Sequence, residues 1–288
     1  MKITFEKKTN TDHLVIVYIN GPDILASKSI DSTTKGLLEK FIKNNEKKKE
    51  LIETVHFYES NKIKSITIAK VINYEVEDSQ NSNWEAFGGR LLSFLEKSRI
   101  SNICLLIEEC RPADMFYLPA ILDGMSMKSY RFEKYKTISK KDFNVKSIKI
   151  VNSFTQVDKS RKNKIISGDN VKGIFLTRDL VSEPANVLYP EKFVDFCKVL
   201  KKAGISIEVL DEKKMKSLRM NALLGVAQGS VRPARTMIMK WLGAKDKKHP
   251  PLAFIGKGVT FDTGGISIKP SGGMEDMKWD MGGSAVVA

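Results

Sequence analysis

The sequence predicts an α/β fold, because short apolar strands alternate with amphipathic helices along most of its 288 residues. A polar and basic stretch at residues 152–170 separates two such alternating regions. No apolar run approaches the roughly 20 residues that a helix needs to cross a bilayer. We therefore expect a soluble chain with two α/β parts and no contact with membranes.

In the first part, each apolar segment can be assigned from its periodicity. Strands are expected at residues 3–5, 14–19, 51–58, 65–72, 102–107, 130–135 and 145–151. Helices are expected at residues 32–45, 83–97 and 113–129, where apolar side chains recur at helical spacing. These elements predict a first domain over residues 1–152 with a mixed or parallel sheet.

The second part carries stronger local signals. A linker with a helix over residues 171–182 is expected at residues 153–183, since the residue before Pro184 disfavours the helical region. Pro190 opens a helix that Gly204 ends, and Asp211 caps a short helix that reaches residue 218. Strands at residues 205–210, 236–242 and 252–255 then predict a second α/β sheet within residues 184–288.

The composition is basic, with a formal net charge of +14 and a pI near 9.5. This balance raises nucleic acid as a candidate partner. The basic residues are mostly lysines in small clusters, at residues 47–49, 140–141, 159–164 and 245–248. Specific readers of nucleic acid usually interleave arginine with aromatic residues on one element, and none of these clusters does. Solvated surface lysine is the favoured interpretation.

Cysteine usage and the N-terminus indicate a cytoplasmic protein. The three cysteines, Cys104, Cys110 and Cys197, have no metal-ligand spacing, and Cys104 lies in an apolar run that predicts a buried thiol. The N-terminus has no apolar run followed by a small-residue cleavage site. We therefore expect a reducing compartment.

The segment of residues 254–283 is the strongest candidate for a functional site. Lys257, Asp262, Lys269 and Asp280 lie there among three glycine pairs, and the segment follows an expected buried strand, at the edge where open α/β sheets bind ligands. The alternatives are a charged surface loop, a salt-bridge network, a phosphate clamp or a metal site. The order G-x-x-x-x-G-K-[ST] of a phosphate clamp is absent.

Chemistry narrows these alternatives further. Carboxylates suit Mg, Mn or Zn, and a lysine amine joins them only when it is deprotonated. A structural zinc site is excluded, because no Cys or His is nearby. His13, His56 and His249 lie elsewhere and are expected to be ordinary surface or core histidines.

Several stretches of the sequence resemble those of one known protein family. The run GKGVTFDTGGISIKPSGGMEDMKWDMGG resembles part of the metal site of the leucyl aminopeptidase family, the two-metal cytosol aminopeptidases. Similar stretches are TRDLVSEPANVLYPEKF, EVLDEKKMKSLRMNALLGVAQGS, RPARTMIMKW and MKSYRFEKYKT. The resemblance implies a small N-terminal domain similar to macro domains, a linker helix and a larger catalytic α/β domain. It also implies a homohexamer.

The resemblance assigns roles residue by residue. Asp262 matches the carboxylate that bridges both metals, and Lys257 and Asp280 match ligands of one of the two sites. Lys269 matches the catalytic lysine that stabilises the oxyanion, and Met277 matches a wall of the pocket for the N-terminal side chain. The implied cofactors are two divalent ions, Mn²⁺ or Zn²⁺. The implied reaction releases N-terminal amino acids from peptides with a free N-terminus.

The chain departs from the family pattern in one respect. The second metal-ligand motif of the family, Asn-Thr-Asp-Ala-Glu-Gly-Arg, does not occur in the 288 residues. We therefore expect a C-terminally truncated catalytic domain, and we expect this chain alone not to release amino acids from a leucyl anilide. The alternative is an inactive remnant whose basic N-terminal domain binds a partner such as nucleic acid.

Overall fold

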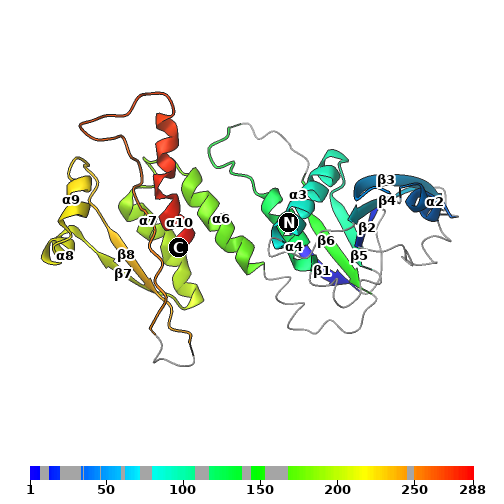
Figure 1. The fold of residues 1–288 in the computed structure, drawn as a ribbon, viewed down its shortest axis with the longest axis horizontal. Helices are drawn as coiled ribbons and strands as arrows, with labels where there is room; N and C mark the ends of the chain where they lie inside the picture. Colours follow the sequence, from blue (N-terminus) through cyan, green and yellow to red (C-terminus); the bar gives the residue numbers. More distant parts are fainter. Residues whose placement is uncertain are drawn as a thin grey trace. The chain divides into compact units, whose positions relative to one another are not determined.

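The structure, a computed structural model, describes residues 1–6, 13–19, 34, 36–45, 47–59, 62–71, 80–107, 117–137, 144–152, 168–244 and 250–288. The chain divides into two compact units, Met1–Val171 and Lys172–Ala288 (Figure 1). Residues 153–167 of the expected linker lie outside the described ranges. The finer division into residues 1–152, 153–183 and 184–288 therefore stays a prediction.

The first unit is built on a six-stranded sheet with the order β1-β6-β5-β2-β4-β3. Its strands are β1 (Lys2–Glu6), β2 (His13–Ile19), β3 (Glu50–Glu59), β4 (Lys62–Val71), β5 (Asn102–Ile107) and β6 (Ser147–Asn152). Neighbours run parallel except β3, which pairs antiparallel with β4 at the edge of the sheet. The structure thus confirms the predicted α/β class with a mostly parallel sheet.

Helices cover both faces of this sheet. They are α2 (Leu37–Asn44), α3 (Gln80–Lys97) and α4 (Tyr117–Ser129) (Figure 1). Val15 of β2 joins a core that contains Leu91 of α3 and Met125 of α4. The next residue, Ile16, joins a second core with Leu38 of α2. Successive residues of a strand point to opposite faces, so α3 and α4 lie on one face and α2 on the other.

The helices α3 and α4 pack so closely that their backbones touch. A Cβ atom added to Gly124 would overlap the carbonyl oxygen of Glu85, and one added to Gly88 would overlap that of Ile121. A Cβ atom on Gly89, the neighbour of Gly88, would meet its nearest atoms at 3.8 Å, an ordinary contact distance. The close approach of the two helices therefore depends on two particular glycines.

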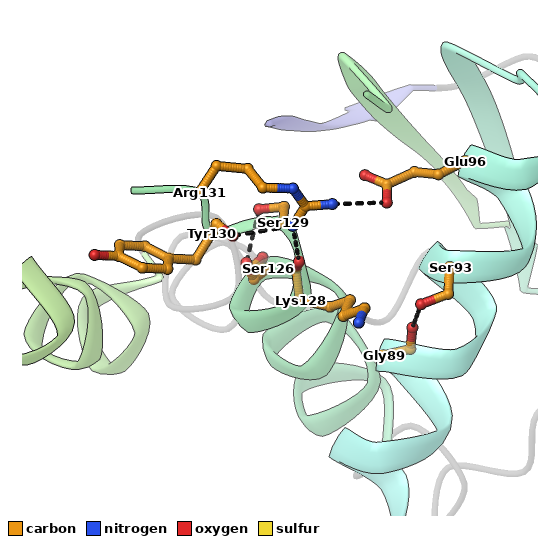
Figure 2. A network of polar contacts seen from close by, with 8 residues as sticks. All are labelled: Gly89, Ser93, Glu96, Ser126, Lys128, Ser129, Tyr130 and Arg131. Atoms are coloured by element: carbon orange, nitrogen blue, oxygen red, sulfur yellow. Dashed lines mark hydrogen bonds and ion pairs between the residues drawn. The ribbon is translucent and has the colours of Figure 1, made fainter. Parts of the chain in front are cut away.

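Residues 130–135 contain no strand, and a turn lies at residues 134–135, so the strand that we predicted there is wrong. Figure 2 shows the contacts at the end of α4. The Nη1 atom of Arg131 donates to the carbonyl oxygens of Lys128 at 2.7 Å and Tyr130 at 2.9 Å. Its Nη2 atom lies 3.1 Å from Oε2 of Glu96 on α3. The carbonyls at a helix C-terminus lack partners within the helix. Arg131 binds them and ties the end of α4 to α3, which overrides the strand preference of the aromatic residues nearby.

The first unit also buries a histidine. His13 is 7% exposed, and its Nε2 atom lies 2.8 Å from Oγ1 of Thr67. Its Nδ1 atom contacts Oγ of Ser65. Burial, and secondly the charge of His56, lower the pKa of His13 from 6.5 to about 4. His13 is therefore a neutral core histidine at pH 7 and His56 is exposed, as predicted, whereas His249 lies outside the described residues.

The second unit consists of short helices and a two-stranded antiparallel sheet. In chain order the elements are α6 (Asp169–Ser182), α7 (Pro190–Cys197), the 3₁₀ helix η2 (Lys198–Ala203), β7 (Ser206–Leu210), α8 (Glu212–Ser217), α9 (Asn221–Ala227), β8 (Thr236–Lys240), the 3₁₀ helix η3 (Met274–Met281) and α10 (Gly282–Val287). Figure 1 shows α6, α7 and α10 together on one side of the β7–β8 pair.

Most of these elements follow the local signals in the sequence. The helix α6 ends before the residue preceding Pro184, and α7 begins with Pro190. Gly204 ends η2 with a φ of 82°. The side chain of Asp211 caps α8 by accepting a hydrogen bond from the backbone N–H of Lys214 at 2.8 Å. These predicted helix starts and stops are confirmed.

The main apolar cluster of the second unit contains the C-terminal end of residues 254–283, the glycine-rich segment. Met281 of η3 and Ala285 of α10 pack with Leu180 of α6 and with Phe193 and Cys197 of α7. A smaller cluster joins α8 and α9 to β7. The glycine-rich segment is thus anchored at its C-terminal end by buried side chains.

The predicted strand at residues 252–255 is wrong. The structure assigns no strand there, and Leu252, Phe254 and Ile255 are between 75% and 96% exposed. A run that is apolar on both faces requires neighbouring strands and covering helices. Among the described residues no strand pairs with this run. The residues therefore lack the ladder of hydrogen bonds that defines a strand.

Two buried cysteines lie in different units. Cys104 of β5 belongs to the first unit and Cys197, at the end of α7, to the second. Burial raises the pKa of Cys197 from 9.0 to about 11. The buried thiol predicted at Cys104 is confirmed, and Cys110 lies outside the described residues.

No helix in the described ranges has the length and hydropathy of a membrane span. Of the four lysine clusters, only residues 47–49 are fully described. There the Nζ atom of Lys48 lies 3.3 Å from Oε1 of Glu53. The described surface thus adds no feature that favours binding of nucleic acid over solvated lysine.

Candidate active site

The glycine-rich segment crosses the second unit as an extended chain, a tight turn and the helix η3. The backbone N–H of Ser284, in α10, donates to the carbonyl oxygen of Lys257 at 2.9 Å. This hydrogen bond places Lys257 beside the start of α10, and therefore close to Asp280 at the end of η3. The ends of the segment are thus brought together although they are more than 20 residues apart in sequence.

A tight turn joins Asp262 to Lys269. The Oδ1 atom of Asp262 accepts a hydrogen bond from the backbone N–H of Gly264 at 2.9 Å. The backbone N–H of Lys269 donates to the carbonyl oxygen of Thr263 at 2.9 Å. Gly264 has a φ of 90°, in the region that favours glycine. The turn therefore folds the backbone of Lys269 back onto that of Asp262.

The four charged candidates form one chain of ion pairs. The Nζ atom of Lys269 lies 3.4 Å from Oδ2 of Asp262 and 3.8 Å from Oδ2 of Asp280. The Nζ atom of Lys257 lies 3.4 Å from Oδ1 of Asp280. Met277 is the fifth member, since its Sδ atom accepts a hydrogen bond from Nζ of Lys269 at 2.9 Å. The structure brings all five predicted residues together.

The two carboxylates differ in their surroundings. The backbone N–H of Gly264, and then the positive charges of Lys269 and Lys257, hold the pKa of Asp262 below its ordinary value of 3.8. The Asp280 side chain is only 25% exposed. Its Oδ2 atom is buried without a hydrogen-bond partner. A buried carboxylate oxygen without such a partner is costly, and a cation that binds it offsets that cost.

This arrangement tests whether the residues fit a metal ion. Carboxylate oxygens and a deprotonated lysine amine are suitable donors for Mn²⁺ or Zn²⁺, and Asp280 offers an oxygen that no hydrogen bond occupies. The described residues contain no group of three or more His, Cys, Asp or Glu side chains that could hold an ion. Lys257, Asp262 and Asp280 therefore offer donors of the kinds that such an ion accepts, but too few to enclose it. In the structure the charged residues form the salt-bridge network that was one of the alternatives considered from the sequence.

Sequence reasoning includes Gly264 only as a member of a glycine pair and misses Thr263. The backbone groups of these two residues bind Asp262 and Lys269. The local sequence Asp-x-Gly was the available signal, because an aspartate side chain often accepts a hydrogen bond from the N–H two residues later.

Comparison with known proteins agrees with the expectation from the sequence. Residues 175–288 match the family model described as cytosol aminopeptidase family, catalytic domain. A probable cytosol aminopeptidase of Brucella anthropi is 45% identical over 210 residues, which are 72% of this chain and 42% of that protein. The chain thus spans less than half the length of this curated relative.

Solved structures share the fold over nearly the whole chain. A mutant of tomato leucine aminopeptidase superposes with a TM-score of 0.73 at 22% identity, over 99% of this chain and 57% of its own. The bottromycin maturation enzyme BotP in complex with Mn superposes with a TM-score of 0.65 at 19% identity, over 95% of this chain and 54% of its own. At these identities the likeness concerns the fold. The sequence matches show that the chain belongs to the cytosol aminopeptidase family.

Proposed function

We propose that residues 257–280 form one side of the two-metal centre of a leucyl-type aminopeptidase, which releases N-terminal amino acids from peptides in the cytoplasm. The observation that carries this proposal is the chain of ion pairs that joins Asp262 and Asp280 to two lysines, in which Oδ2 of Asp280 is buried without a hydrogen bond. The family matches support the same reaction class.

The roles follow from the chemistry of each side chain. Asp262 and Asp280 would supply carboxylate oxygens to two divalent ions, and Lys257 would supply an amine. When bound, such ions provide Lewis acidity and lower the pKa of a water molecule. Mn²⁺ is the first ion to test, because the structure of BotP was solved in complex with Mn. Zn²⁺ is the second.

Lys269 would act on the substrate. Its ammonium is held by Asp262, Asp280 and Met277, so it can place positive charge where the peptide oxygen becomes negative. Stabilisation of that charge is worth about 10²–10³ in rate in comparable sites. Met277 would form an apolar wall for the N-terminal side chain of the peptide. We further propose a homohexamer as the functional assembly.

A chimera tests the reaction. Residues 1–288 would be joined to the part of the Brucella anthropi relative that follows its counterpart of Ala288. We expect Mn²⁺-dependent release of leucine from a leucyl anilide. Lys269→Met should lower kcat about 10²–10³-fold. Lys278→Met removes the same charge from η3 outside the ion-pair chain and should retain activity.

The 288-residue chain without this addition is the second arm. Two ions need more donors than Lys257, Asp262 and Asp280 provide, so we expect no turnover. A folded chimera without activity, or an active chimera that does not depend on Lys269, would contradict the proposed function.

A further inference from the structure

Lys269 occupies the position between the two carboxylates that are proposed as metal ligands. Its Nζ atom has an oxygen of Asp262 at 3.4 Å, an oxygen of Asp280 at 3.8 Å and the sulfur of Met277 at 2.9 Å. The contact with Asp280 is too long for a hydrogen bond, so charge links Lys269 to this carboxylate oxygen.

Lys269 is the ion-pair partner that the two carboxylates share. Lys257 contacts Asp280, but no ion pair between Lys257 and Asp262 occurs among the described residues. Two carboxylates that approach the same point repel each other, and a cation between them removes that repulsion. The Oδ2 atom of Asp280 has no hydrogen bond, and the positive charge of Lys269 lies 3.8 Å from it.

The backbone holds both ends of this contact while the lysine side chain stays movable. The turn fixes the backbones of Asp262 and Lys269 through Gly264 and Thr263. The side chain of Lys269 is 37% exposed and has a flexible four-carbon stem. Its ammonium can therefore leave the carboxylates without rearrangement of the turn.

We propose that Lys269 is a placeholder cation. In the metal-free chain its ammonium keeps Asp262 and Asp280 together, and it moves off their oxygens when a divalent ion enters. The inference rests on the proposed metal site and adds a positioning role to the proposed catalytic role of Lys269. The inference also predicts that Lys269 competes with the metal ion for the two carboxylates. The repulsion between an ammonium and a doubly charged ion is twice that between two unit charges at the same distance.

The first arm of the test measures Mn²⁺ binding to the purified 288-residue chain by the loss of the electron paramagnetic resonance signal of free Mn²⁺. We expect Lys269→Met to bind Mn²⁺ about tenfold more tightly than the wild type. Lys278→Met, which loses the same charge from η3, should bind like the wild type. Lys269→Arg keeps a cation at the site and should restore weak binding. Equal or weaker binding by Lys269→Met would overturn the competition.

The second arm needs no metal. Hydrogen exchange of the metal-free chain should be faster over residues 262–281 in Lys269→Met, with wild-type exchange in Lys269→Arg and Lys278→Met. Unchanged exchange over α3 and α6 shows that the variant is folded. Unchanged exchange over residues 262–281 would overturn the placeholder role.

The two arms also separate this inference from the proposed function. If none of these chains binds Mn²⁺, the proposed metal site loses its support. Faster exchange in Lys269→Met would then still support the lysine as the group that holds the carboxylates together.

Discussion

The two units of the chain differ in how completely they bury their apolar side chains. In the first unit, side chains such as Leu91, Leu105 and Ile148 are fully buried between a six-stranded sheet and its helices. In the second unit, Leu252 and Ile255 face solvent, and the sheet has two strands. Two-stranded sheets are marginal without further packing.

The difference shows where each unit obtains its stability. The first unit closes a core with its own elements. The second unit is stabilised by two smaller clusters, one joining α6, α7, η3 and α10 and one joining α8, α9 and β7, together with helix caps and ion pairs. An exposed apolar patch commonly marks a surface that another polypeptide covers. The apolar run at residues 252–255 is therefore one place where the second unit falls short of a closed core.

The largest expected effect comes from side-chain truncation in the two units. Leu91→Ala removes a fully buried side chain and should lower the free energy of unfolding of the first unit by about 2–5 kcal/mol. Ile255→Ala should change the stability of the second unit by less than about 0.5 kcal/mol, because this side chain is exposed. Urea titration followed by peptide-resolved hydrogen exchange measures both. A comparable loss from Ile255→Ala would show that the run is packed in solution.

Acid should weaken the two units over different pH ranges. The folded pKa of His13 is about 4, below the ordinary 6.5, so the unfolded chain binds the proton more readily between these values. The first unit should therefore lose up to about 3 kcal/mol as the pH falls from 6.5 to 4. The contribution of Asp262 is present above pH 3.8 and is lost as the pH falls through its lower folded pKa.

Urea titrations at several pH values test this contrast. His13→Asn should remove the slope between pH 6.5 and 4. His56→Asn should keep most of it, because burial is the larger cause of the shift. Equal acid sensitivity of the wild type and His13→Asn would show that His13 is not the source of this loss of stability.

The contact between α3 and α4 should give an effect of intermediate size. Gly124→Ala forces a methyl group into the carbonyl oxygen of Glu85 and should cost about 1–3 kcal/mol. Gly89→Ala lies where a Cβ atom finds ordinary contacts, so its better helix propensity should be neutral or stabilise by up to about 1 kcal/mol. Thermal denaturation of the two variants distinguishes the packing effect from propensity. If both behave alike, the helices are further apart than the structure shows.

The smallest effect is expected at a helix cap of the second unit. Asp211→Ala removes the acceptor for the N–H of Lys214 and should destabilise α8 by about 1 kcal/mol. Asp211→Asn retains an acceptor and should lose only a fraction of this. Hydrogen exchange at residues 212–217 reports the change. A loss in the asparagine variant equal to that in the alanine variant would mean that charge, and not the hydrogen bond, stabilises the cap.

The sequence predicted best what depends on neighbouring residues. Pro190, Gly204 and Asp211 start, stop and cap helices through local rules, and the structure confirms each. The strands predicted at residues 130–135 and 252–255 are both wrong, because contacts with distant residues decide the structure there. The side chain of Arg131 closes α4 through Glu96, which lies 35 residues earlier, and no local pattern shows that contact.

The sequence selects the residues of the candidate site but does not predict how they contact each other. Glycine pairs and the family resemblance selected Lys257, Asp262, Lys269, Met277 and Asp280. That Lys269 lies between both carboxylates depends on the turn at Gly264 and on the hydrogen bond that brings α10 to Lys257. Both are contacts across the segment, which spacing alone does not specify. The roles of the five residues stay proposals.

The two buried thiols can report separately on the opening of each unit. A thiol reacts with an alkylating reagent as its thiolate, and only when solvent reaches it. Cys104 is covered by the core of the first unit and Cys197 by the cluster of the second, so each is labelled only when its own unit opens. Peptide mapping distinguishes both from Cys110. The labelling rates of one unmodified sample therefore report how often each half of the chain opens.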